Sequence, residues 1–312
     1  MNRATIIIPT LRRPDSLNRA ARSLFELSDT GKVERLIIVD NDPQATAEAT
    51  ARALITDAPF SVIYVHQPQA GIATARNTGL VHVDDARFIA FLDDDEIASS
   101  HWLKSLLDVQ KQFDADVVFG PIKGIAPQAR SVIRPVVETF FSRHGPDTDG
   151  LIARTYGCGN SLMKRQTALS GDAPFATSTN QTGGEDDVLF ATLQQQGARF
   201  AWAANAWVQE HAPPHRSNLA YLLQRAFARG QGPSQSAADT GDIAALIRWM
   251  AIGLGQFAVF GLGSIGTGLG LTRTGAQLMI RSVEGIGKVL WFNSFEPKLY
   301  GSAELKRRDQ GA

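Results

Sequence analysis

The sequence predicts an α/β protein built on a mainly parallel β-sheet with helices on both faces. Short unbroken apolar runs recur through the first part of the chain, and segments with apolar residues at helical spacing separate them. A strand that is apolar at every position is typical of a parallel sheet buried on both sides, where the intervening helices cover the two faces. We expect strands at 5–8, 36–39, 61–65, 88–92 and 117–120.

Each expected element rests on a local pattern. The β-branched run at 5–8 is stopped by Pro9, which lacks the N–H that a strand ladder needs. Apolar residues recur every three or four positions between the strands, which predicts helices at 14–27, 46–54, 71–80 and 100–113. Residues 121–150 carry several Pro and Gly with little periodicity, so we expect loop and irregular structure there.

Polar groups follow three of the expected strands. The first strand leads into Thr10-Leu11-Arg12-Arg13, the second into Asp40-Asn41-Asp42, and the fourth into Asp93-Asp94-Asp95. In parallel sheets, ligands bind beyond the carboxyl ends of the strands. We therefore expect these groups to converge on one crevice. No G-x-G-x-x-G follows the first strand, which argues against a dinucleotide-binding dehydrogenase.

Composition narrows the class of protein. The 31 Lys and Arg balance the 31 Asp and Glu, so the basic excess that is typical of nucleic-acid binders is missing and no nucleic-acid partner is expected. The chain has one cysteine, Cys158, which excludes an internal disulfide and favours a reducing compartment. The opening MNRATIIIPT does not read as a signal peptide. We expect a protein that meets any membrane from the cytoplasmic side.

The stretch FIAFLDDDE at 88–96 is the strongest sign of a site. Hard divalent cations such as Mg²⁺ and Mn²⁺ prefer carboxylate oxygens and often bind together with substrate phosphates. Three aspartates can also form an ordinary solvated turn. Their place at the end of a buried strand in a parallel-sheet pattern favours the metal and phosphate site.

Further candidate site residues lie elsewhere in the chain. Asp40 ends a strand and could accept hydrogen bonds from a base or ribose, although Asp-Asn-Asp also makes ordinary turns. Arg76 lies in Gly-Ile-Ala-Thr-Ala-Arg-Asn at a helix start. Gly183-Gly184-Glu185-Asp186-Asp187 opens another helix, where an acid either caps the helix or serves as a general base. His211 and His215 could each supply a metal ligand or be structural.

The chain changes character after Pro213-Pro214. Apolar residues from 219 to 227 form a stripe with arginines largely outside it, which suits a helix at a membrane interface. Residues 249–271 carry no charge and exceed the ~20 residues that span a bilayer. Seven glycines weaken that helix. Three arrangements stay open for it: spanning the membrane, lying in its interface, or packing on the catalytic domain.

Taken together, these motifs resemble the family 2 glycosyltransferases, which have the GT-A fold. The resemblance spans about the first 230 residues. Y-G-C-G-N at 156–160 and A-W-V-Q-E at 206–210 look most like the bacterial succinoglycan-type glucosyltransferases, which build exopolysaccharide repeats on a lipid carrier. The ordered matches are I-I-P-T at 7–10, V-D-N at 39–41, G-I-A-T-A-R-N at 71–77, F-L-D-D-D at 91–95, W-L at 102–103, G-G-E-D at 183–186 and P-P-x-R at 213–216.

The resemblance implies a role for each matching residue. Asp186 would be the catalytic base, with Glu185 positioning it or the acceptor. Asp95 would ligate Mg²⁺ or Mn²⁺. The family often has a histidine where this chain has Gln209, so His211, two residues later, is the candidate for a further metal ligand. The nucleotide-sugar donor would contact the remaining matches: Pro9, Thr10, Arg12, Asp40, Arg76, Asn77, Asp93 and Asp94.

The activity that the resemblance implies is an inverting transfer of a sugar, with glucose expected, from a UDP-sugar to a lipid-linked or polysaccharide acceptor in bacterial exopolysaccharide or cell-surface glycan synthesis. Residues 1–215 would form the GT-A catalytic domain. Residues 216–312 would form a helical region associated with the cytoplasmic side of the inner membrane. Two alternatives stay open: a sugar-1-phosphate nucleotidyltransferase, which wants a glycine-rich basic loop where this chain has Pro9-Thr10-Leu11-Arg12-Arg13-Pro14, and an inactive nucleotide-sugar-binding protein.

Overall fold

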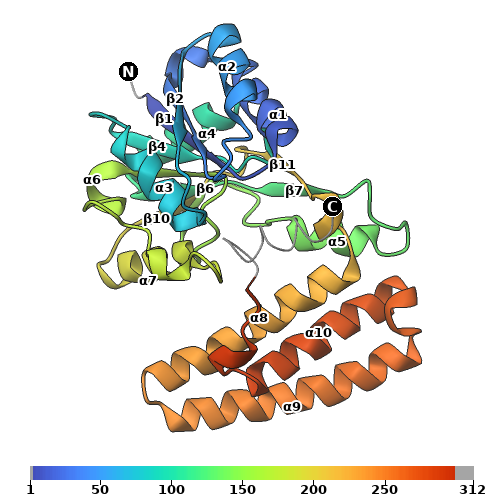
Figure 1. The fold of residues 1–312 in the computed structure, drawn as a ribbon. Coiled ribbons are helices and arrows are strands. Elements are labelled where there is room, and N and C mark those ends of the chain that lie inside the picture. Colours follow the sequence, from blue (N-terminus) through green and yellow to red (C-terminus); the bar gives the residue numbers. More distant parts are fainter. Residues whose placement is uncertain (1–2, 299–312) are drawn as a thin grey trace. The chain divides into compact units, whose positions relative to one another are not determined.

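The computed structural model describes residues 3–298 and divides them into two compact units (Figure 1). Among these residues, unit 1 holds 3–123 and 143–211, and unit 2 holds 124–142 and 212–298. Each unit has its own buried apolar residues, so each is described by itself. The expected α/β class with a mixed, mainly parallel sheet is confirmed in unit 1.

Unit 1 is built around an eight-stranded sheet with the order β3–β2–β1–β4–β9–β6–β10–β8. Strands β1 to β4 pair in parallel, whereas β9 and β8 are antiparallel to their neighbours. The bounds are β1 Ala4–Thr10, β2 Val33–Asp40, β3 Ser61–His66, β4 Phe88–Phe91, β6 Val117–Phe119, β8 Gly150–Ile152, β9 Ser161–Lys164 and β10 Phe200–Trp202. A second sheet has the order β5–β11–β7, with bounds Glu96–Ala98, Val208–His211 and Ile122–Ile125.

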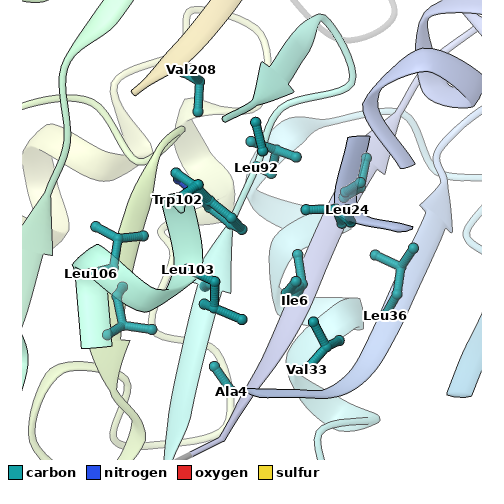
Figure 2. Packing of buried hydrophobic residues seen from close by; sticks show 14 of the residues in the cluster. Ala4, Ile6, Leu24, Val33, Leu36, Leu92, Trp102, Leu103, Leu106 and Val208 are labelled. Carbon is teal, nitrogen blue, oxygen red and sulfur yellow. The ribbon is translucent and has the colours of Figure 1, made fainter. Parts of the chain in front are cut away.

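Helices bury both faces of the main sheet. Alternate side chains of a strand point to opposite faces, and β1 follows this rule: Ile6 and Ile8 pack in one apolar cluster and Ile7 in the other. The first cluster includes Leu24 and Trp102 (Figure 2). The helices of unit 1 are α1 Pro14–Phe25, α2 Glu48–Asp57, α3 Ile72–Val81, α4 Trp102–Phe113, α6 Arg165–Ala168 and α7 Glu185–Gln195, with 3₁₀ turns η1 Thr30–Lys32 and η2 Thr177–Thr179.

The expectation of irregular structure at 121–150 is wrong in part. This segment contains β7, the helix α5 Arg134–Phe141 and the start of β8. Proline is tolerated in the first turn of a helix, where its missing N–H has no partner to lose, and Pro135 occupies that turn. Val136 and Val137 are buried in the apolar cluster of unit 2. Burial in the tertiary structure therefore stabilises this helix. The weak periodicity of its sequence does not reveal that burial.

Unit 2 consists of α5 and three longer helices. These are α8 Leu219–Asp239, α9 Ile243–Gly266 and α10 Arg273–Val289, with 3₁₀ turns η3 Pro214–Arg216, η4 Leu269–Leu271 and η5 Asn293–Phe295. The expectation that the stripe at 219–227 meets a membrane is wrong. Leu222 and Ala226 are buried in the same cluster as Val137, Ala276 and Ile280. The stripe is apolar because it faces the interior of unit 2.

Glycines let α8, α9 and α10 approach closely. A Cβ atom placed on Gly285 of α10 would lie 2.7 Å from the Gly253 carbonyl oxygen of α9. A Cβ on Gly230 of α8 would lie 2.1 Å from the Glu284 carbonyl oxygen of α10. The hydroxyl of Ser282 also donates to the Phe257 carbonyl at 3.0 Å. These backbone contacts leave no room for a side chain.

We expect Gly285→Ala to destabilise unit 2 and Gly255→Ala to stabilise it. The first substitution forces α9 and α10 apart and should cost about 1–3 kcal/mol, the usual cost of overpacking. A Cβ on Gly255 meets nothing within 4 Å, so alanine there should gain about 0.5–1 kcal/mol in helix propensity. Chemical denaturation of the two variants measures both effects. Equal stabilities would contradict the close packing.

Candidate functional site

The acidic turn after β4 lies against the residues that follow β1. The hydroxyl of Thr10 donates to Asp94 Oδ2 at 2.7 Å. Arg13 Nη1 donates to Asp94 Oδ1 and to Asp95 Oδ2, both at 2.8 Å. Burial opposes the charge of Arg13, but Asp94 and Asp95 outweigh it and raise the arginine pKa above its usual value. Arg13, to which the sequence assigned no role, is therefore the counter-ion of two of the three aspartates.

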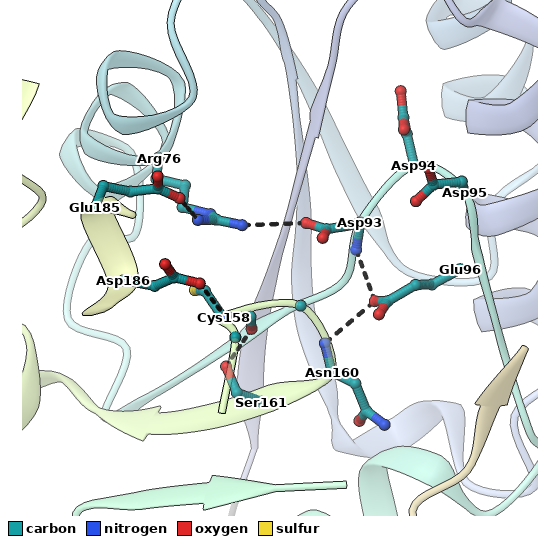
Figure 3. A network of polar contacts seen from close by, with 12 residues as sticks. Arg76, Asp93, Asp94, Asp95, Glu96, Cys158, Asn160, Ser161, Glu185 and Asp186 are labelled. Carbon is teal, nitrogen blue, oxygen red and sulfur yellow. Dashed lines mark hydrogen bonds and ion pairs between the residues drawn. The ribbon is translucent and has the colours of Figure 1, made fainter. Parts of the chain in front are cut away.

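Arg76 joins Asp93, the remaining aspartate of the acidic turn, to the start of α7 (Figure 3). Its side chain lies on α3, is almost fully buried, and pairs with Asp93 Oδ1 at 3.2 Å and with Glu185 Oε1. The guanidinium also lies over the rings of Phe91 and Phe175, with centroids at 6.0 and 5.6 Å. One cation thus connects the strand end that carries the acidic turn with the helix that carries the expected base.

Asp186 is the second residue of α7, and its carboxylate is held by backbone groups. Its Oδ2 accepts the Cys158 N–H at 2.9 Å and its Oδ1 accepts the Asp187 N–H at 3.0 Å. Gly184 caps the helix with a φ of 90°, a conformation that favours glycine. Burial, with the nearby charges of Asp95 and Asp186, raises the pKa of Asp93 against the pull of Arg76. Asp93 and Asp186 therefore lie in one electrostatic environment.

The acidic turn is held in place by hydrogen bonds that involve Glu96 and Asn160. Glu96 Oε2 accepts the Asp93 N–H at 2.9 Å and the Asn160 N–H at 3.1 Å (Figure 3). Asn160 adopts a φ of 51°, accepts Trp102 Nε1–H at 2.7 Å and donates to two backbone carbonyls. Burial first, then the charge of Asp93, raises the pKa of Glu96 well above its usual value. Glu96 ends the FIAFLDDDE stretch and Asn160 lies in the Y-G-C-G-N motif, but no local pattern predicted that the two residues meet.

Arg143 is a third cation of the site, and sequence reasoning did not predict it. Its Nη1 donates to the Gly159 carbonyl at 2.8 Å and its Nη2 to the Gly157 carbonyl at 2.9 Å. Burial lowers the arginine pKa, while Glu96 and Asp186 oppose that change. Arg143 therefore fixes the loop whose N–H groups bind Glu96 and Asp186. It lies in the segment that was expected to be irregular.

Asp40 lies at the end of β2 and is fully buried. Its Oδ1 accepts the Asp42 N–H at 3.2 Å, and its Oδ2 accepts the Ala47 N–H at 2.8 Å and the Tyr64 hydroxyl at 3.0 Å. Both oxygens thus stabilise the loop that follows the strand. Its role toward a base or ribose stays a prediction.

The other expected donor contacts divide into two groups. Pro9 is buried at the end of β1, and Arg12 Nε donates to Asp42 Oδ1 at 3.1 Å. Asn77 is hydrogen-bonded in both directions to the backbone of Phe175, at 2.8 and 3.1 Å, so its side chain holds that segment on α3. The acidic turn brings together Thr10, Arg76, Asp93 and Asp94. In contrast, the side chains of Asp40 and Asn77 are hydrogen-bonded to the backbone of other loops.

The residues around Asp95 fit a divalent metal in part. β11 brings His211 alongside, because the His211 N–H donates to the Asp95 carbonyl at 2.8 Å. His211 Nε2 is buried and has no hydrogen-bond partner within residues 3–298. Burial and Arg19 lower the pKa of His211 against the pull of Asp95, which favours the neutral imidazole, the form that binds metals. Within those residues no group of three or more His, Cys, Asp or Glu side chains is arranged around a metal site. Diphosphate and water oxygens would have to complete the shell.

At one edge of a mixed sheet the chain gathers an acidic turn, the arginines that neutralise it and a carboxylate at a helix start. This arrangement is suited to nucleotide-sugar transfer. The family model "Glycosyl transferase family 2" matches residues 5–168, more than half of the chain. The chain belongs to this family and is a transferase. The expected family and enzyme class are thereby confirmed.

Individual relatives agree with this assignment. The succinoglycan biosynthesis protein ExoM of Rhizobium meliloti strain 1021 is 35% identical over 224 residues, 71% of each chain. ExoW of the same strain is 34% identical over 128 residues, 40% of this chain and 39% of that one. The mannosyltransferase PcManGT of Pyrobaculum calidifontis, solved with GDP-Man and Mn²⁺, superposes with a TM-score of 0.62 at 16% identity, covering 93% of this chain and 87% of that chain. This last likeness confirms the GT-A fold.

We expect Glu96→Gln to flatten the pH dependence of stability. Because the pKa of Glu96 is raised in the folded state, the folded chain keeps the Glu96 proton to a higher pH than the unfolded chain does. Stability is therefore lost as pH rises from the usual glutamate range, near 4.5, toward the folded pKa. Glutamine keeps an acceptor for the two N–H groups and has no charge to bury. Unfolding midpoints from pH 5 to 8, in chelator, should fall less in the variant.

The exposed Glu34→Gln is the matched control and should follow the wild type. A Glu96→Gln midpoint that falls with pH as steeply as the wild type would show that the buried carboxylate is ionised without cost.

Proposed function

We propose that the chain is an inverting glycosyltransferase that moves glucose from a UDP-sugar to a lipid-linked saccharide in bacterial exopolysaccharide synthesis. The observation that carries this proposal is the placement of Asp186. Its carboxylate lies on a glycine-capped helix start, is held by the Cys158 N–H, and shares the electrostatic environment of Asp93. A carboxylate beside the acidic turn of a family 2 enzyme is in place to act on an acceptor.

The chemistry is a single displacement. Asp186 accepts the proton of the acceptor hydroxyl, and that oxygen forms a bond to the anomeric carbon of the donor sugar. The bond between that carbon and the diphosphate oxygen breaks, and the nucleoside diphosphate leaves with the electron pair. Attack from the side opposite to the leaving group inverts the anomeric configuration. Arg76 is the counter-ion of Glu185, so the carboxylate next to the base in sequence has a cation of its own.

The cations of the site orient the donor. Arg76 is buried and Arg13 is partly buried, and aspartates compensate both, so they can turn part of their charge toward a diphosphate without moving far. Asp95 and His211 would hold the divalent metal. When bound, Mg²⁺ or Mn²⁺ supplies positive charge that stabilises the leaving diphosphate. PcManGT was solved in complex with Mn²⁺ as well as GDP-Man, which supports this choice of cofactor.

The proposed acceptor and location rest on two further observations. ExoM is named as a succinoglycan biosynthesis protein, which supports an exopolysaccharide product. Among the described residues, α9 is the one helix whose length and apolar composition would let it cross a membrane, and a membrane is where a lipid-linked saccharide is found. We propose a catalytic domain at 1–215 and a helical region from 216 that meets the cytoplasmic face of the inner membrane.

We expect Asp186→Asn to lower the turnover number at least a thousandfold. Asparagine keeps the size of the side chain and its contact with Cys158 N–H but cannot take the acceptor proton. The measurement is release of UDP from UDP-glucose in the presence of Mn²⁺ and a lipid-linked saccharide, with binding of UDP scored separately. Near wild-type turnover would remove Asp186 from the role of base.

Asp187→Asn, one residue along and exposed, is the matched control and should keep wild-type turnover. The wild-type assay is run with UDP-, GDP- and dTDP-sugars. Preference for a GDP- or dTDP-sugar would overturn the UDP assignment, and absence of release from every donor would favour the inactive binding protein.

We expect Asp95→Asn and His211→Ala each to weaken Mn²⁺ binding at least tenfold in the presence of UDP. Asparagine removes the anionic oxygen, and alanine removes a buried nitrogen that has no partner within the described residues. Titration calorimetry or the Mn²⁺ spin-resonance signal measures the affinity. His101→Ala, an exposed histidine, is the control. Unchanged affinity in His211→Ala would leave Asp95 as the protein ligand of the pair.

A further inference from the structure

The outward face of α9 is a long apolar surface. Eight large apolar side chains of this helix are 40–72% exposed, while only Gly253 and Ser264 of the helix are buried. Arg248 is the one charged residue within its bounds. The eight side chains form what we call the α9 face: Ile243, Ile247, Ile252, Leu254, Phe257, Val259, Leu262 and Ile265.

The opposite side of α9 packs along α10, which runs antiparallel to it. Contacts show which residues of α9 and α10 lie side by side: Gly253 is next to Gly285, and the Ser282 hydroxyl donates to the Phe257 carbonyl at 3.0 Å. Toward the other end, Ser264 donates to the Gly275 carbonyl at 2.9 Å. The central turns of α9, around 253–260, therefore lie beside residues 281–285 of α10.

Charged groups lie at this central level. The guanidinium of Arg281 is over the ring of Phe260, 5.6 Å from its centroid. Glu284 accepts from Arg229 of α8 at 2.9 Å and lies 3.7 Å from Lys288 Nζ. If α9 crossed a bilayer, these four charges would sit near the middle of the hydrocarbon layer, where charged side chains are rare and costly. A spanning orientation is therefore the unfavourable one.

An orientation parallel to the membrane removes this conflict. The α9 face then enters the boundary between headgroups and acyl chains, and the charged side chains of α8 and α10 stay in water. The charge balance of the three helices agrees. Residues 219–290 contain six Lys and Arg against three Asp and Glu, although the whole chain is balanced at 31 of each. A net positive surface complements anionic headgroups.

We propose that α9 lies in the plane of the membrane and inserts the α9 face into the cytoplasmic leaflet without crossing it. The partner is a lipid surface that carries anionic headgroups. This inference rests on the proposed membrane location of the enzyme. It names the orientation of α9, which the sequence left open between spanning the membrane, lying in its interface and packing on the catalytic domain.

Cysteine labelling tests the orientation in the full chain. Asp239 and Thr274 are exposed and flank the turns at the two ends of α9, so each is changed to cysteine in a separate variant. The native Cys158 is 1% exposed and serves as the unlabelled background. An impermeant maleimide is applied to sealed spheroplasts and to sealed inverted vesicles from a bacterial host. Both cysteines should react in inverted vesicles and neither in spheroplasts.

A spanning helix gives a different pattern. It places the two cysteines on opposite sides, so one would react in spheroplasts and be protected in inverted vesicles. Reaction of either cysteine in spheroplasts, or protection of either in inverted vesicles, overturns the proposal.

Vesicle binding tests the α9 face itself. We expect Leu254→Ser/Leu262→Ser/Ile265→Ser to bind vesicles containing phosphatidylglycerol at least tenfold more weakly than the wild type. A control of three exposed apolar residues in unit 1, Ile55→Ser/Val81→Ser/Leu151→Ser, should bind as the wild type does. Circular dichroism checks that each variant folds. A wild-type chain that dimerises through this face and does not bind the vesicles would overturn the proposal.

Failure of this inference and failure of the proposed function are distinguishable. Neither test involves a sugar. A chain that lies in the membrane plane yet transfers no sugar loses only the proposed function. A chain that transfers glucose while its α9 crosses the membrane loses only this inference.

Discussion

Unit 1 depends on arginines that neutralise crowded carboxylates. Arg13, which is partly buried, pairs with Asp94 and Asp95, and the buried Arg76 links Asp93 to Glu185 at the start of α7. Removing one partner of a buried pair such as Arg76–Glu185 typically costs about 3–5 kcal/mol, because the remaining charge has lost its solvent. Glu96 and Asp186 lie beside these pairs and accept backbone N–H groups.

The sheet makes this crowding possible by bringing distant segments to one edge. Strands β1 and β4 pair in parallel up to Ile7 and Phe91, so Thr10 and Asp94, each three residues further on, meet although 84 residues separate them. On the other side, β9 follows Asn160, whose backbone holds Glu96. The apolar interior therefore fixes where charges meet, and the charges fix how the loops run.

Local patterns were enough to predict β1 to β4, β6, most helices of unit 1 and the acidic turn, because each depends on neighbouring residues. Residues that act across long separations escaped prediction. Arg143 binds carbonyls at 157 and 159 from a segment without periodicity. The stripe at 219–227 shows the opposite failure: its apolar period was clear, but periodicity does not say whether protein or lipid covers the face.

The link from Asp93 through Arg76 to Glu185 also sets a distance. A guanidinium is planar and rigid, so the gap between the acidic turn and the first turn of α7 is the width of one side chain instead of the outcome of loop folding. Asp186, which follows Glu185 directly, therefore keeps its separation from the acidic turn even where the loop before Gly184 changes in sequence. The spacing of the two acidic segments and the sequence of that loop are in this sense independent variables of the fold.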